Sequence, residues 1–119
     1  MLKKILILDD DPQLLEELKG CLENEYQVFT LQNSKSALEA AVEIKPDVIL
    51  LDVEMPGESG LQIASKIMYF SDLRSEIIVM SGREERHKAV AQLCGFKGFL
   101  LKPFDYEELR STLEAPAAG

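Results

Sequence analysis

The chain has 119 residues, of which 46% are hydrophobic and 29% are charged, and this length suits a single compact domain with one core. Its formal net charge of -8 at pH 7 argues against non-specific binding to nucleic acids, which requires a basic surface. The first apolar run, Ile5 to Leu8, is too short for a signal peptide or a membrane span, so we expect a cytoplasmic protein that does not contact membranes.

Five short apolar segments predict buried β-strands, because each is rich in Val, Ile, Leu or aromatic residues and ends at charged or turn-forming residues. In chain order they are Lys4 to Leu8, Tyr26 to Leu31, Asp47 to Asp52, Ile77 to Met80 and Gly98 to Leu101. The third is almost entirely Val, Ile and Leu, and it delivers the carboxylate of Asp52 to a loop that contains Pro56 and Gly57.

A helix is predicted after each strand, from apolar residues that recur at helical spacing. The expected starts are Pro12 with Asp11 as its cap, Asn33 or Ser34, Ser59-Gly60, Glu84, and Asp105 as a cap paired with Glu108. The second helix should end before Pro46 and the fourth at Cys94. The expected inward-facing residues are Leu14, Leu15, Leu18 and Leu22; Ala37, Leu38, Ala41 and Val42; Leu61, Ala64, Ile67 and Met68; Ala89, Val90 and Leu93; and Tyr106, Leu109 and Leu113.

Strict alternation of strands and helices implies right-handed crossovers and a parallel sheet with helices on both faces, which is a doubly wound α/β fold. In such a sheet the carboxyl ends of the strands lie along one edge, where ligands bind. Polar side chains gather at these ends: Asp9, Asp10 and Asp11 after the first strand, Asp52 after the third, Ser81 after the fourth and Lys102 after the fifth. We therefore expect a functional site at this edge.

Carboxylates that converge on one point repel one another, so this group of residues predicts a bound cation. Oxygen ligands without His or Cys favour a hard ion such as Mg²⁺, or Mn²⁺. A carboxylate can also attack phosphorus and form an aspartyl phosphate, a transfer that depends on neutralising the charge of the phosphoryl oxygens. The Lys102 ammonium, the Ser81 hydroxyl and loop N–H groups are candidates for this neutralisation.

Four short motifs occur in order along the chain, one near the end of each of four predicted strands. They are Ile5-Leu6-Ile7-Leu8-Asp9-Asp10-Asp11-Pro12, Asp52-Val53-Glu54-Met55-Pro56 with Gly60 following, Ser81-Gly82, and Lys102-Pro103-Phe104. Together they resemble the response-regulator receiver domain of two-component signalling, over about Lys3 to Leu113. The resemblance implies a flavodoxin-like five-stranded sheet of order 2-1-3-4-5 with five helices. It also implies a receiver domain over 1–114, with 115–119 as a flexible tail or the start of a linker.

The resemblance implies a role for each acidic position. Asp52 would be the phosphoacceptor. Asp10 would be the main ligand of the metal ion, with Asp9 contributing through water, and Asp52 and the backbone carbonyl of Glu54 would complete the protein ligands.

The other strand-end residues would bind the phosphoryl group and transmit its presence. Ser81 would turn to bind a phosphoryl oxygen, Lys102 would pair with it, and Phe99 occupies the aromatic switch position that moves inward with Ser81. The bond between Lys102 and Pro103 is the candidate cis peptide, because cis bonds occur almost only before proline. Ser81 and Phe99 depart from the commoner Thr and Tyr of the family, and neither departure removes the chemistry.

Partners and kinetics follow from the same resemblance. A histidine kinase or phosphotransfer protein would phosphorylate the domain. An output domain or effector protein would contact the face formed by the fourth helix, fifth strand and fifth helix, and phosphorylation would allow a homodimer. No direct binding to nucleic acid by this domain is expected. Glu54 and Arg83 lie two residues after Asp52 and Ser81, at positions that modulate dephosphorylation in this family, and we expect their opposite charges to pair.

Two other functions are alternatives to a phosphoacceptor. A phosphorylation-independent interaction module would keep the fold without using the pocket. A metal-dependent phosphatase would use Asp9 and Asp11 as its Asp-x-Asp pair, but Pro12 and Gln13 follow where a hydroxyl residue is expected. A nucleotide-binding P-loop is excluded because the chain contains no Gly-x-x-x-x-Gly-Lys.

Overall fold

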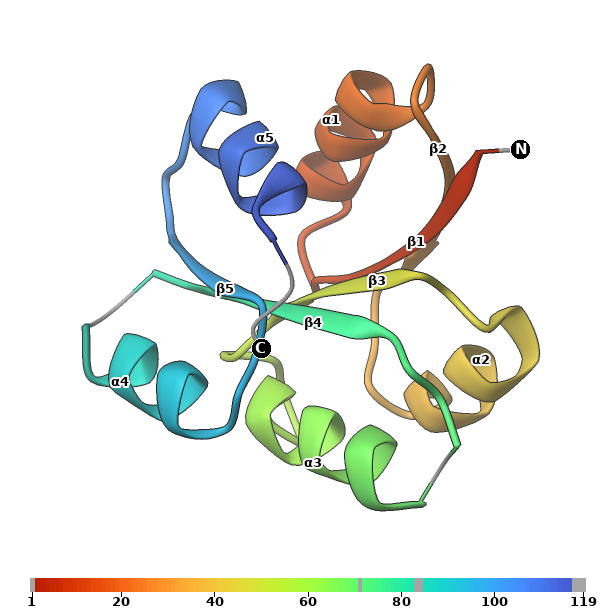
Figure 1. The fold of residues 1–119 in the computed structure, drawn as a ribbon. Coiled ribbons are helices and arrows are strands. Elements are labelled where there is room, and N and C mark those ends of the chain that lie inside the picture. Colours follow the sequence, from red (N-terminus) through yellow and green to blue (C-terminus); the bar gives the residue numbers. More distant parts are fainter. Residues whose placement is uncertain (1, 71, 83–84, 117–119) are drawn as a thin grey trace.

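The computed structural model describes residues 2–70, 72–82 and 85–116, and it shows a single parallel sheet between two layers of helices (Figure 1). The strands are β1 (Lys3–Leu8), β2 (Tyr26–Leu31), β3 (Val48–Asp52), β4 (Glu76–Ser81) and β5 (Gly98–Leu101). The helices are α1 (Pro12–Leu22), α2 (Ala37–Ile44), α3 (Gly60–Phe70), α4 (Glu85–Leu93) and α5 (Tyr106–Glu114). The strand order is β2-β1-β3-β4-β5 and every neighbouring pair is parallel, which confirms the predicted doubly wound fold.

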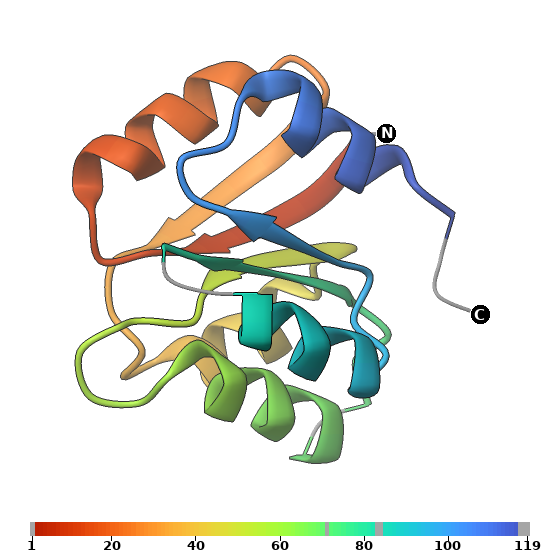
Figure 2. The same cartoon turned by 90° about the vertical axis from the view of Figure 1, so that its left-hand side faces the viewer.

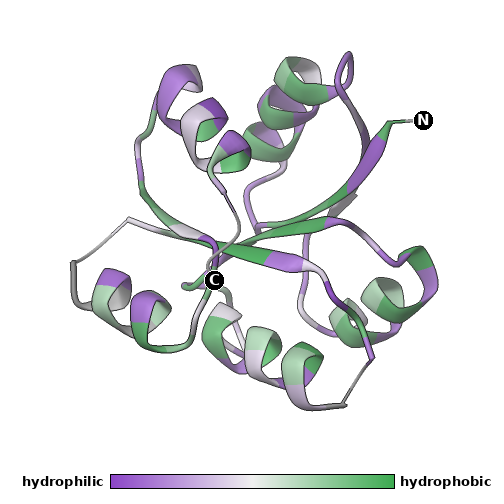
Figure 3. Ribbon diagram, viewed as in Figure 1, coloured by the Kyte–Doolittle hydropathy of each residue, from purple (hydrophilic) through white to green (hydrophobic). Residues whose placement is uncertain are grey.

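Helices α1 and α5 cover one face of the sheet, and α2, α3 and α4 cover the other (Figure 1). The central strand β3 is buried along its whole length, and its residues alternate between the two interfaces. Ile49 and Leu51 pack with α2, α3 and α4, whereas Val48 and Leu50 pack with α1 and α5. In Figure 3 the middle strands are mainly hydrophobic, while the helices carry both hydrophilic and hydrophobic residues. The continuous apolar run of β3 is therefore explained by burial on both faces.

Three predicted helix starts have capping interactions, of which those at Asp11 and Asp105 were expected from the sequence. The side chain of Asp11 accepts a hydrogen bond from the Gln13 N–H (3.0 Å) with Pro12 in the first turn of α1. Asp105 accepts one from the Glu108 N–H (2.8 Å) at the start of α5. Before α3, the hydroxyl of Ser59 accepts from the N–H of Gln62, whose own side chain accepts from the N–H of Ser59. These bonds satisfy N–H groups that the first turn of a helix leaves without partners.

The start of α2 was predicted too early. The helix begins at Ala37, after Asn33 and Ser34, because these residues form a local turn instead. The side chain of Asn33 accepts a hydrogen bond from the Lys35 N–H (3.1 Å), and the Ser34 carbonyl accepts one from the Ala37 N–H (3.2 Å). A side chain that bonds its own backbone in this way competes with helix formation.

Several helix residues that were predicted to face the core are exposed. Val42 is 46% exposed and Met68 is 50% exposed, since each follows a buried residue, Ala41 or Ile67, and a helix rotates by about 100° per residue. Two of the three predicted core residues of α4 were also wrong, because Ala89 is exposed and Leu93 is 87% exposed; among the described side chains of this helix, Ala91 is buried. The side chain of Val90 and the predicted helix start at Glu84 lie outside the described residues. In α5, Leu109 and Leu113 are buried as predicted, but Tyr106 is 36% exposed.

None of the helices within the described ranges is long and apolar enough to cross a membrane. Of the predicted tail, Ala115 and Pro116 are described, and 117–119 lie outside the described residues. The carbonyl of Ala115 accepts a hydrogen bond from the Lys97 ammonium (2.7 Å), which also donates to Glu76 (3.0 Å). Lys97 therefore joins the end of α5 to the start of β4.

Candidate functional site

The strands end on one side of the sheet, so their last residues form a single edge (Figure 2). Asp52 is the last residue of β3 and Ser81 the last residue of β4, while Asp9 follows β1 and Lys102 follows β5. Residues from four strands, far apart in the sequence, therefore meet at the edge where the sequence predicts a site.

The acidic residues at this edge form one cluster. A carboxylate oxygen of Asp9, one of Asp10 and one of Asp52 all lie within 4.8 Å of one another. Asp9 is wholly buried and Asp52 is 4% exposed, whereas Asp10 is exposed to solvent. Oxygen donors of this kind suit Mg²⁺ or Mn²⁺, and the exposed position of Asp10 leaves a path for an ion to enter from solvent. The donor set thus fits the predicted metal.

Lys102 supplies a positive charge to two of these carboxylates. Its ammonium nitrogen lies 2.5 Å from Asp9 Oδ2 and 3.5 Å from Asp52 Oδ2. Burial alone lowers the pKa of Lys102, but the hydrogen bond to Asp9 and the charges of Asp52 and Asp9 outweigh burial and raise this pKa above its usual value. The lysine is therefore a fixed cation at neutral pH.

The environment of Asp52 disfavours its charge. Burial is the main cause that raises the pKa of this carboxyl above its usual value, and the negative charge of Asp9 raises it further. The Glu54 N–H, which donates to Asp52 Oδ1 at 3.2 Å, and the Lys102 ammonium act in the opposite direction without cancelling the rise. A cation bound beside Asp52 would favour the ionised form, which is the form that acts as a nucleophile.

The backbone after Asp52 is fixed by close packing against the start of α3. The Val53 N–H donates to the Met80 carbonyl of β4 (2.8 Å), and the Gly60 N–H donates to the Val53 carbonyl (3.0 Å). A Cβ atom at Gly60 would lie 2.1 Å from the Asp52 carbonyl oxygen and 2.6 Å from the Leu51 side chain. Only glycine fits there, so Gly60 allows the strand that carries Asp52 to approach α3 closely.

Ser81 and Glu54 are joined by a hydrogen bond that the sequence did not predict. The Ser81 hydroxyl donates to Glu54 Oε1 at 2.5 Å, and the same oxygen accepts from the Gly82 N–H at 3.0 Å. The sequence-based prediction pairs Glu54 with Arg83, which lies outside the described residues. The sequence signal for the observed bond is the parallel placement of Asp52 and Ser81 at neighbouring strand ends, which brings the loop after β3 over the end of β4.

The remaining predicted residues lie in β5 and directly after it. Phe99 is half-buried and packs against the core beneath α2, α3 and α4. The Lys102–Pro103 peptide bond is cis, in agreement with the expectation from the sequence. The Lys102 N–H donates to the Ser81 carbonyl at 2.8 Å, so the end of β5 is fixed to the end of β4.

Comparisons of sequence with known proteins point to one family. The family model of the response regulator receiver domain matches residues 5–114. Protein PilH of Pseudomonas aeruginosa is 34% identical over 119 residues, which cover 98% of this chain and 98% of PilH. The transcriptional regulatory protein KdpE of Mycobacterium tuberculosis is 34% identical over 113 residues, which cover 93% of this chain and 49% of KdpE. The chain thus spans nearly all of the first relative and about half of the second.

Solved structures show the same fold. A response regulator receiver domain protein from Clostridium thermocellum superposes with a TM-score of 0.85 at 28% identity, covering 94% of this chain and 91% of its own. The chemotaxis protein CheY4 of Vibrio cholerae gives a TM-score of 0.85 at 27% identity, covering 96% and 98%. The match of the family model, the similarity to PilH along its length and the conformity of the fold all agree: the chain belongs to the family of response regulator receiver domains.

Proposed function

We propose that this receiver domain accepts a phosphoryl group on Asp52 from a histidine kinase or a phosphotransfer protein, in a reaction that requires Mg²⁺ or Mn²⁺. One observation carries the proposal: the buried carboxylate of Asp52 lies in a cluster with Asp9 and Asp10, with the Lys102 ammonium at 3.5 Å. A nucleophilic carboxylate, a set of metal ligands and a fixed cation are the groups that phosphoryl transfer to an aspartate requires.

Each acidic residue has an assigned part in binding the metal. We assign Asp10 as the main ligand, Asp9 as a ligand through water, and Asp52 and the Glu54 backbone carbonyl as the other protein ligands. When bound, the ion would neutralise charge on the phosphoryl oxygens. The metal site and the phosphoacceptor therefore share Asp52.

In the transfer, a carboxylate oxygen of Asp52 forms a bond to phosphorus as the bond from phosphorus to the donor's imidazole nitrogen breaks. The electron pair of the broken bond stays with the imidazole, which leaves as the other product. Lys102 attracts the phosphoryl oxygens, and the Ser81 hydroxyl donates a hydrogen bond to one of them. No further reactant is needed, because the phosphohistidine supplies both the phosphoryl group and the leaving group.

The phosphorylated state would be transmitted to partners through α4, β5 and α5. We assign Phe99, a half-buried residue of β5 on the face of the sheet that α4 covers, as the aromatic side chain that moves inward when Ser81 turns. Large apolar side chains are exposed on each of these three elements: Leu93 at 87%, Leu101 at 44% and Tyr106 at 36%. An output domain or effector protein in the cytoplasm is the expected partner, and phosphorylation would allow a homodimer.

Loss of the phosphoryl group is the other half of the signal. We propose that Glu54 and Arg83 set its rate, because they lie two residues after Asp52 and Ser81 and carry opposite charges. Residues 1–114 would suffice for both reactions, with 115–119 as a tail or the start of a linker.

An intact-mass experiment with acetyl phosphate and Mg²⁺ tests the proposal directly. Wild type should gain a single phosphoryl adduct, and Asp52→Asn or wild type in EDTA should gain none. Beryllium fluoride, which mimics a phosphoryl group on an aspartate, should bind wild type with Mg²⁺. If neither reagent modifies or binds the wild-type protein, the domain is a phosphorylation-independent interaction module instead.

A further inference from the structure

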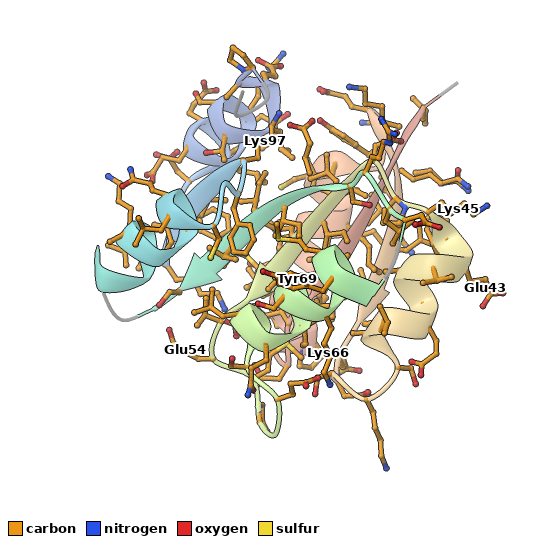
Figure 4. All side chains as sticks on the ribbon, turned by 60° about the horizontal axis from the view of Figure 1, so that its bottom comes forward. Glu43, Lys45, Glu54, Lys66, Tyr69 and Lys97 are labelled. Atoms are coloured by element: carbon orange, nitrogen blue, oxygen red, sulfur yellow. The ribbon has the colours of Figure 1, made fainter. Side chains whose placement is uncertain are left out.

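The Glu54 carboxylate fixes the direction of the Ser81 hydroxyl. Its Oε1 atom accepts hydrogen bonds from Ser81 Oγ at 2.5 Å and from the Gly82 N–H at 3.0 Å. Ser81 is wholly buried, whereas Glu54 is exposed and lies beside the end of the β4 arrow in Figure 4. A bond from a buried hydroxyl to an ionised acceptor is stronger than a bond between neutral groups, so this contact stabilises the observed orientation of Ser81.

A serine hydroxyl has a single proton and can donate to one acceptor at a time. In this structure Ser81 donates to Glu54. Under the proposed function, Ser81 donates to a phosphoryl oxygen on Asp52 instead. The two acceptors therefore compete for the same proton, and the bond to Glu54 must break before the second bond can form.

The backbone and the side chain of Glu54 have opposite effects on the site. Its N–H donates to Asp52 Oδ1 at 3.2 Å and so supports the phosphoacceptor. Its carboxylate accepts the hydrogen bond from the Ser81 hydroxyl and so opposes the turn of that hydroxyl toward a phosphoryl group. A side-chain substitution keeps the N–H, so the effect of the carboxylate can be measured separately.

We propose that Glu54 is a positioning residue that opposes activation: its carboxylate competes with the phosphoryl group for the Ser81 hydroxyl. This proposal rests on the proposed phosphoacceptor function. It predicts that the domain without this carboxylate binds a phosphoryl mimic more tightly, because the phosphoryl oxygen then no longer competes with Glu54 for the Ser81 hydroxyl. The gain must depend on the hydroxyl of Ser81.

The experiment is a calorimetric titration of the full chain with beryllium fluoride at saturating Mg²⁺, which measures the dissociation constant of beryllium fluoride. Glu54→Ala should lower the dissociation constant by roughly tenfold or more, the size expected for a hydrogen bond to a charged acceptor. Glu54→Gln should give a smaller gain, because the amide oxygen still accepts a hydrogen bond without the charge. The matched control is Glu58→Ala in the same loop, whose carboxylate pairs with Lys66 on α3, and it should change the constant by less than about twofold.

A second background separates competition from simple charge repulsion. The double variant Ser81→Ala, Glu54→Ala should have a dissociation constant within about twofold of that of Ser81→Ala alone. Neither protein has the Ser81 hydroxyl for which Glu54 and the phosphoryl mimic would compete. The proposal is overturned if Glu54→Ala leaves the affinity unchanged or weakens it, or if the gain persists in the Ser81→Ala background. If none of the proteins, wild type included, binds beryllium fluoride, the phosphoacceptor function itself fails and the competition fails with it.

A second measurement tests the hydrogen bond of Glu54 in the protein without any phosphoryl mimic. In amide hydrogen exchange by NMR, the Gly82 N–H should exchange faster in Glu54→Ala than in wild type, because its acceptor is lost. The Val79 and Met80 amides of the same strand should keep their protection, which also shows that the variant is folded. Unchanged exchange at Gly82 would contradict the hydrogen bond on which the proposal depends.

Discussion

The Lys102 ammonium donates a hydrogen bond to the wholly buried carboxylate of Asp9, 93 residues away in the sequence, at a distance of 2.5 Å. This bond joins the end of β5 to the end of β1, although two other strands lie between them in the sheet. A buried carboxylate without a partner is costly, so Lys102 has a structural part in addition to its proposed part in phosphoryl binding.

Replacing Lys102 with Met should therefore destabilise the protein. We expect the free energy of unfolding to fall by about 3 kcal/mol, because the Asp9 charge is left buried and unpaired. Urea denaturation at neutral pH without Mg²⁺ measures this loss. Asp9→Asn in the Lys102→Met background should restore most of the stability but not phosphorylation. A Lys102→Met protein as stable as wild type would show that the ion pair contributes nothing.

The stability of the protein should respond to the charge of Asp52. The pKa of this carboxyl is higher in the folded protein than its usual value of 3.8, mainly because of burial, so protonation favours the folded state. That stabilising contribution is complete below pH 3.8 and is lost as pH rises through the higher folded-state pKa. Asp52→Asn is neutral at every pH, so it should melt at a higher temperature than wild type at pH 7.

The difference in melting temperature between Asp52→Asn and wild type should shrink as pH falls towards 4. Thermal melts in EDTA across this range measure it. Glu43→Gln, an exposed residue of α2, is the control for a change in net charge. A difference that stays constant with pH would mean that the Asp52 carboxyl does not have a raised pKa in the folded protein.

Binding of Mg²⁺ should stabilise the fold through the acidic cluster. At a concentration tenfold above the dissociation constant, a ligand specific for the folded state adds about 1.4 kcal/mol to the free energy of unfolding. We expect Asp10→Asn to remove most of the Mg²⁺-dependent rise in melting temperature. Asp72→Asn, in the loop before β4 at the opposite edge of the sheet, should keep that rise. Equal Mg²⁺ responses in both variants would place the bound ion elsewhere.

Replacing Gly60 with Ala should destabilise the protein and disturb the site more than replacing a helical glycine that has free space around it. Gly60→Ala forces a Cβ atom into the Asp52 carbonyl, and we expect a loss of about 1–3 kcal/mol in stability together with slower phosphorylation. Gly20→Ala is the matched control, because nothing lies within 4 Å of its Cβ position in α1. The control should be neutral or gain up to about 1 kcal/mol in helix propensity. Similar effects of the two substitutions would argue against a specific close contact at Gly60.

The lifetime of the phosphorylated protein should depend on Arg83. Arg83→Ala removes the positive charge that we expect to pair with Glu54 across the mouth of the site, where the pair would obstruct water. The variant should then lose its phosphoryl group faster than wild type. Intact-mass measurements at intervals after removal of acetyl phosphate monitor this loss. Arg74→Ala, an exposed loop residue, is the control. An unchanged or longer lifetime would rule out this role.

The fold was predictable because the strand segments are strongly apolar and the helix starts have capping residues. The alternation of these segments leaves few topologies once crossovers are right-handed. The exposures of Val42, Met68 and Leu93 were predicted wrongly for a physical reason. A residue at the border of a helix's apolar stripe is buried only if a neighbouring element covers it, and the sequence of one helix carries no information about that cover.

The positions of the site residues were predictable from strand ends, but their contacts were not. Asp9, Asp10 and Asp52 meet as expected, because the topology brings these strand ends together. The bond between Glu54 and Ser81 depends on the rotamer of a long, exposed side chain, and several partners are within reach of such a chain. Which partner the Glu54 carboxylate binds depends on local geometry that sequence spacing does not specify.

The sheet separates the interior into two layers of side chains, and this division has a consequence for protein engineering. Ile49 and Leu51 belong to one layer and Val48 and Leu50 to the other, so the layers are linked through strand backbones. Substitutions placed in different layers should therefore have additive effects on stability, whereas pairs within a layer should couple. A designer could repack the layer beneath α1 and α5 as a unit and leave the layer beneath α2, α3 and α4 as it is.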